Sequence, residues 1–127
     1  MLNYVTVGTN DLARAGAFYD AVLGALGYAR LATSEREIGY GVAGQEHCRF
    51  WVNLPFDTRP ASVGNGSMPA FEAPTRDAVA AAHKAGIEQG GSDEGAPGPR
   101  PSYGPNFFAC YLRDPDGNKL SAVCEAP

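Results

Sequence analysis

Residues 111–124 have the sequence YLRDPDGNKLSAVC, in which two runs of apolar or β-favouring residues flank the segment DPDGN. Segment 114–118 offers a proline for a fixed φ, a glycine for positive φ, and Asp and Asn side chains for local hydrogen bonds. The stretch therefore predicts a β-hairpin. Symmetric pairing about the turn places two pairs opposite each other on one face, Tyr111 with Ser121 and Ala109 with Val123.

The segment before this hairpin repeats the organisation of the first half of the chain. In the first half a strand at 3–8 precedes a helix at 10–27, whose apolar residues share one face, and strand-like runs follow at 28–33, 37–43 and 48–53. In the second half a strand at 68–73 precedes a second helix, and a long loop at 92–106 leads to the hairpin at 107–124. We expect Asn10 and Thr75 to cap the two helices, and Gly27 and Gly90 to end them.

The repeat predicts two modules in one domain, with module one at about 1–54, a Pro/Gly-rich linker at about 55–66 and module two at about 67–127. Each half is too small to bury a helix and both ends of its sheet, so we expect the halves to pack together. A sheet of about four strands twists and curls. Two curled sheets side by side enclose a cleft.

Composition restricts the kind of partner. The net charge of −4 opposes binding to nucleic acid or to an anionic membrane. Neither a signal peptide nor a transmembrane helix is expected, and we predict a cytoplasmic protein. Three cysteines without CxxC spacing, Cys48, Cys110 and Cys124, predict reduced strand residues and no disulfide framework or structural zinc site.

Three segments carry a resemblance to a known family: "DLARAGAFYDAVLGALGY", "AFEAPTRDAVAAAHKAG" and "GAPGPRPSYGPNFFACYLRDPDGNKLSAV". They resemble the vicinal oxygen chelate superfamily of glyoxalases, bleomycin resistance proteins and extradiol dioxygenases, over nearly the whole chain. The resemblance implies an α+β fold of two βαβββ modules that form a curled, open barrel-like mixed sheet with helices outside. It also implies a homodimer and a small-molecule site inside the curve. Whether the modules pair within one chain or between two remains open.

Metal-dependent members of this superfamily hold one divalent ion with His or Glu side chains from four strands. Matching the motifs places Tyr4, Trp51 (or Phe50), Met68 and Ser121 at the four corresponding positions. A phenol, an indole, a thioether and a hydroxyl are poor ligands for such an ion. We therefore expect no divalent metal and no other cofactor, and we predict that these side chains converge on one cavity. Each of them is also a common structural residue in a strand.

The long loop at 92–106 is a candidate lid, because long loops beside clefts often carry function. Its Arg100 is a candidate clamp for a carboxylate or phosphate, while Tyr103 and Phe107 are candidates for stacking on a ligand. A solvated arginine and a packing tyrosine are the alternative. Together with Tyr111, these residues complete the predicted ligand-binding set of Tyr4, Phe50, Trp51, Met68, Arg100, Tyr103, Phe107, Tyr111 and Ser121.

Among the remaining polar residues, His83 is expected to pack at a helix edge and His47 to lie near the cleft mouth. Glu72 and Asp77 are interpreted as surface charges that favour the N-terminus of the second helix. The first functional hypothesis is a metal-free protein that binds a small, partly aromatic molecule, like the bleomycin-binding members. The alternatives are a glyoxalase-like lyase or isomerase, or a dioxygenase-like enzyme, using a metal or acid–base groups among Tyr4, His47, Tyr103 and Tyr111. A third is an interaction module whose own side chains fill the cleft.

Overall fold

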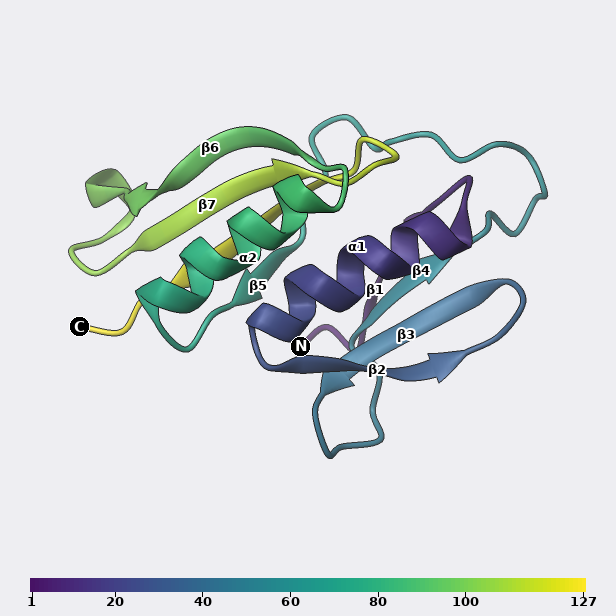
Figure 1. Ribbon diagram of the computed structural model, residues 1–127, viewed down its shortest axis with the longest axis horizontal. Helices are drawn as coiled ribbons and strands as arrows, with labels where there is room; N and C mark the ends of the chain where they lie inside the picture. Colours follow the sequence, from purple (N-terminus) through teal and green to yellow (C-terminus); the bar gives the residue numbers. More distant parts are fainter.

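The computed structural model describes all 127 residues, Met1 to Pro127, and contains two four-stranded sheets and two α-helices (Figure 1). In chain order the elements are β1 (Val5–Gly8), α1 (Leu12–Ala25), β2 (Tyr28–Thr33), β3 (Glu37–Val42), β4 (Phe50–Asn53), β5 (Ala70–Glu72), α2 (Arg76–Glu88), β6 (Ser92–Pro99), a 3-10 turn (Pro101–Tyr103), β7 (Phe108–Arg113) and β8 (Lys119–Cys124). Each half has the order βαβββ, which confirms the predicted repeat and fold class. Neither helix is long and apolar enough to cross a membrane.

Both sheets are mixed and open. The strand order is β1-β4-β3-β2 in the first half and β5-β8-β7-β6 in the second. β1 pairs with β4 in parallel, as β5 does with β8, and the other pairs are antiparallel. Consequently β1 and β5 each have one unpaired edge.

The C-terminal hairpin has the predicted register. Tyr111 lies opposite Ser121, and Ala109 lies opposite Val123. Gly117 has φ of 93° in the connecting turn, a conformation that a glycine adopts without steric cost.

The two helices pack against each other and share one apolar core with the sheets. α1 and α2 run side by side in Figure 1, and the buried core cluster draws residues from both helices and both sheets. At their contact a Cβ on Gly86 would lie 2.7 Å from Leu112 Cδ1 and 3.2 Å from Val22 Cγ2. Only glycine fits this close approach. Each helix covers one face of its sheet, and we call the opposite face the open face.

Helix α1 begins one residue later than expected. Its N-cap is Asp11, whose carboxylate accepts a 3.0 Å hydrogen bond from the backbone N–H of Arg14. The Asn10 side chain binds the backbone of Ala61 instead, accepting a bond of 2.6 Å and donating one of 3.2 Å. The prediction of Asn10 as the cap is therefore wrong, because a contact with the linker engages its amide. Thr75 caps α2 as predicted, accepting from the N–H of Ala78.

The prediction of a loop at 92–106 is also wrong for most of its length. Residues Ser92–Pro99 form β6, an edge strand paired with β7, and a short 3-10 turn follows. An edge strand pairs with a neighbour on one side only, so a proline there can face solvent on the side where it lacks an N–H donor. The register shifts between Asp93 and Gly95 and again between Gly95 and Gly98, which accommodates the irregular sequence.

Candidate functional site

The turn between β7 and β8 connects the two halves through a buried carboxylate. Asp114 is 4% exposed and accepts hydrogen bonds from the Tyr19 hydroxyl (2.7 Å), the Asn118 amide (2.9 Å) and the backbone N–H groups of Asp116 and Asn118 (2.9 Å each). The Asn118 amide also donates to the carbonyl of Gly8 at 2.8 Å. Burial, and then the Asp114 carboxylate, raise the pKa of Tyr19 well above its usual value. The phenol therefore stays protonated and acts as a donor.

A second carboxylate of the same turn binds the junction between β1 and α1. Asp116 accepts from the Thr9 hydroxyl at 2.5 Å, from the N–H of Asn10 at 3.0 Å and from the guanidinium of Arg14 at 3.1 Å. The helix tyrosine and the DPDGN turn, on which the family resemblance depends, thus contact each other and hold the halves together. Their role in this fold is structural.

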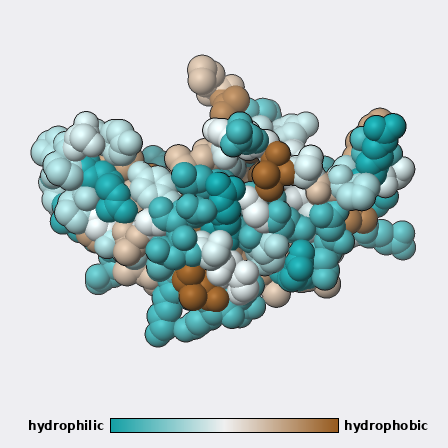
Figure 2. Space-filling view, turned by 90° about the horizontal axis from the view of Figure 1, so that it is seen from above, coloured by the Kyte–Doolittle hydropathy of each residue, from teal (hydrophilic) through white to brown (hydrophobic).

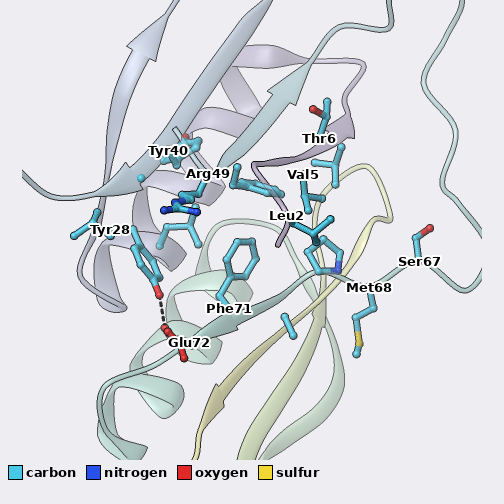
Figure 3. A pocket seen from close by; sticks show the side chains of 17 residues that line it. Leu2, Val5, Thr6, Tyr28, Tyr40, Arg49, Ser67, Met68, Phe71 and Glu72 are labelled. Atoms are coloured by element: carbon cyan, nitrogen blue, oxygen red, sulfur yellow. Dashed lines mark hydrogen bonds between the residues drawn. The ribbon is translucent and has the colours of Figure 1, made fainter. Parts of the chain in front are cut away.

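A cavity of about 730 Å³ opens between the first sheet and β5 (Figure 3). Its floor is aromatic: Phe50 packs edge-on against Phe71 with ring centroids 4.9 Å apart, and its ring lies at a tilt of 55° to that of Tyr19, with centroids 5.0 Å apart. Phe50 is 4% exposed, and the Tyr40 ring beside it is fixed by a 2.8 Å hydrogen bond from its hydroxyl to Asp20. Burial, and then this bond, raise the pKa of Tyr40 above its usual value. The floor is therefore rigid and neutral.

The rim of the cavity is apolar and partly exposed. Leu2, Val42 and Met68 line it with exposed fractions of 67%, 39% and 40%. On the face seen in Figure 2, hydrophobic side chains reach the surface in small separate patches. Exposed apolar side chains around a concave apolar cavity are typical of a ligand site or an interface.

Several polar residues also line this cavity, and we call three of them the polar end: Tyr28, Arg49 and Glu72. The Tyr28 hydroxyl donates to the Glu72 carbonyl at 2.8 Å, and burial, followed by the Glu72 carboxylate, raises the pKa of Tyr28. Arg49 takes part in none of the four ion pairs of the chain. In Figure 3 Arg49 and Tyr28 lie on one side of the cavity, and Leu2 and Met68 lie on the other.

Of the nine side chains predicted to bind a ligand, only Phe50 and Met68 line this cavity. Trp51 and Ser121 point to the open faces of their own sheets, because their strand neighbours are in the core. Ser121 is 1% exposed and its hydroxyl donates to the Cys110 carbonyl at 3.0 Å. Tyr4, next to β1, is 55% exposed. Within one chain, the four positions that correspond to metal ligands therefore do not share this cavity.

The remaining predicted residues form two clusters on the second half. The Arg100 guanidinium lies 5.4 Å above the Tyr111 ring and donates to the carbonyls of Ala96, Gly98 and Pro99. Most of its donors are thus used by its own strand rather than left for a ligand. Tyr103 and Phe107 pack edge-on with centroids 5.4 Å apart, and Tyr103 is 67% exposed.

The two histidines lie outside the cavity. His83 forms a 2.8 Å pair with Asp93 and its side chain is 17% exposed, which agrees with a packed residue at a helix edge. His47 is exposed and its Nε2 lies 3.2 Å from the carbonyl of Asn3. No group of three or more His, Cys, Asp or Glu side chains is arranged to hold a metal ion.

Sequence reasoning missed the polar end. Glu72 was interpreted as a surface charge, which its exposure supports, while Arg49 and Tyr28 were not singled out. No sequence signal identifies them, because the cavity arises where two segments distant in the chain meet.

Comparison with known proteins establishes the family. Residues 1–121 match the Glyoxalase/Bleomycin resistance protein/Dioxygenase superfamily, whereas no curated protein sequence matches the chain. A glyoxalase/bleomycin resistance protein from Albidiferax ferrireducens T118 is 37% identical, with a TM-score of 0.85 and 98% of each chain covered.

Two more distant structures share the fold. A glyoxalase-related enzyme from Fulvimarina pelagi is 20% identical with a TM-score of 0.74, covering 98% of this chain and 87% of that one. Lactoylglutathione lyase from Agrobacterium tumefaciens is 16% identical with a TM-score of 0.66, covering 98% and 92%. With the family match over nearly all of its length, the chain belongs to the glyoxalase/bleomycin resistance protein/dioxygenase superfamily.

Proposed function

We propose that this protein binds a small, partly aromatic molecule in the cavity between its first sheet and β5, without a bound metal ion. The observation that carries the proposal is the cavity itself, about 730 Å³ with a rigid aromatic floor and few polar groups. Ligand sites in proteins occupy about 300–1,000 Å³ and combine apolar walls with a small number of polar contacts. Offset and edge-on packing on Phe50 and Phe71 suits a flat ring.

The neutral aromatic compound 2-naphthamide tests this proposal by isothermal titration calorimetry. We expect saturable binding with one site per chain. Val42→Trp places an indole at the cavity rim and should abolish binding. Val63→Trp is the matched control, because Val63 is 42% exposed, close to the 39% of Val42, but lies in the linker outside the cavity. If 2-naphthamide does not bind, or binds equally to the Val42→Trp protein, the proposed site is wrong.

Elemental analysis tests the metal-free part separately. The purified protein should contain no stoichiometric zinc, nickel, manganese or iron, because the phenol, indole, thioether and hydroxyl at the four positions matched to metal ligands are poor donors for such an ion. One tightly held ion per chain, lost together with stability on chelation, would contradict this part of the proposal.

We further propose that the protein acts as a homodimer. Supporting this are the unpaired edges of β1 and β5 and the exposed apolar side chains beside them, among them Leu2, Tyr4 and Met68. A second chain that covers these edges would also close the rim of the cavity.

A further inference from the structure

Arg49 is the only cationic side chain that lines the cavity. Its backbone is held in the sheet, with its N–H donating to the Tyr40 carbonyl at 2.7 Å and its carbonyl accepting from Val5 at 3.0 Å. The guanidinium at the end of the side chain forms no ion pair within the protein. A well-anchored residue thus places an unpaired charge beside an apolar cavity.

The opposing charge is Glu72, which lines the same cavity. Glu72 also borders a second, shallower hollow that contains Glu125. Glu72 is exposed, so solvent and salt screen its carboxylate, which opposes an anionic ligand only weakly.

Resting on the small-molecule site proposed above, we propose that its ligand is an aromatic carboxylate, with its ring on Phe50 and Phe71 and its carboxylate bound by Arg49. The planar guanidinium fork matches a carboxylate and forms two parallel charge-assisted hydrogen bonds. An apolar floor with one cation at its side selects a molecule with one apolar and one anionic end. A cationic ligand would place its charge beside Arg49.

Isosteric naphthalene compounds separate the charge from the ring. Calorimetry with 2-naphthoate, neutral 2-naphthamide and cationic 2-naphthylmethylamine should rank the carboxylate tightest and the amine weakest. Because Arg49 is exposed, we expect a preference for naphthoate over naphthamide of about fivefold, the equivalent of a favourable exposed ion pair of about 1 kcal/mol. The preference should decrease as salt is added.

Arg49→Gln should remove this preference, so that the variant binds naphthoate and naphthamide equally, because a neutral side chain cannot form the charge-assisted pair. Arg59→Gln is the matched control, because it removes the same charge from the linker outside the cavity and should keep the preference. Glu72→Gln should strengthen naphthoate binding by about twofold, the effect of removing a weak, screened repulsion.

Each outcome decides one question. Equal binding of naphthoate and naphthamide, or a preference that survives Arg49→Gln, overturns the carboxylate assignment while the proposed cavity stands. Tighter binding of the amine than of the acid also overturns it, because Glu72 would then dominate. Failure of all three compounds to bind refutes the proposed site, and the carboxylate assignment with it.

Discussion

Replacing Tyr19 by Phe removes one hydroxyl from the buried network around Asp114. The hydroxyl donates a 2.7 Å hydrogen bond to a carboxylate that is 4% exposed, and Tyr19 itself is 1% exposed. Hydrogen bonds to charged groups contribute about 1.5–3 kcal/mol to stability. Asp114 keeps its three other donors, so the carboxylate is weakened but not left unpaired. We therefore expect Tyr19→Phe to lower the free energy of unfolding by about 2 kcal/mol.

Urea unfolding followed by circular dichroism measures this change, and thermal melting should show a decrease of about 8 °C for a chain of this length. Tyr103→Phe is the control, because Tyr103 is 67% exposed and its hydroxyl has no partner in the protein, so its loss should have no measurable effect. A double-mutant cycle with Asp114→Asn should give a coupling energy of about 1–2 kcal/mol. A Tyr19→Phe protein as stable as Tyr103→Phe, or a cycle without coupling, would refute the argument.

Three further predictions concern titration, thiol reactivity and assembly. Burial raises the pKa of Tyr19 and Tyr40, so the stability they contribute is complete below the unfolded tyrosine pKa of about 10 and is lost as pH rises toward the folded values. The free energy of unfolding should thus fall above about pH 10, and less steeply in Tyr19→Phe. Cys48 is only partly buried and should react with a disulfide reagent in the folded protein. The two buried cysteines, Cys110 and Cys124, should react only after unfolding, and burial also raises the pKa of Cys110. Light scattering should show a dimer, and a stable interface of this kind should bury upwards of about 1,000 Å². Met68→Asp should shift the protein toward monomer. A wild-type monomer at all concentrations above micromolar would contradict the interface.

The fold was predictable from sequence because its strongest signals are local. The hairpin register follows from turn residues and alternation, and the Thr75 cap follows from its place before the apolar face of α2. The errors lie where tertiary contacts decide. Asn and Asp are equally good caps, so Asp11 replaces Asn10 only because the linker engages Asn10. The proline-rich sequence of β6 indicates a loop until its pairing with β7 is known.

The candidate cavity depends on how the two halves pack against each other. Alternation along a strand tells which residues share a face, but it does not show how two sheets are placed relative to each other. Phe50 and Met68 reach the cavity, whereas Ser121 lies buried in its own sheet with its hydroxyl bonded. Arg49 carries no sequence signal, and its position at the cavity depends on β5, which follows it by some twenty residues in the chain.

The bond between Tyr19 and Asp114 joins residues 95 positions apart, and the bond between Asn118 and Gly8 spans 110. During synthesis on the ribosome, the first half of the chain is made well before the turn at residues 114–118. That turn supplies the hydrogen-bond partners of Tyr19 and Gly8. Until then α1 exposes the apolar surface that α2 later covers, and the Tyr19 hydroxyl lacks its partner. Long-range contacts of this kind form late and slow folding. The apolar face of α1 is thus covered only after α2 and the turn at residues 114–118 have both been made.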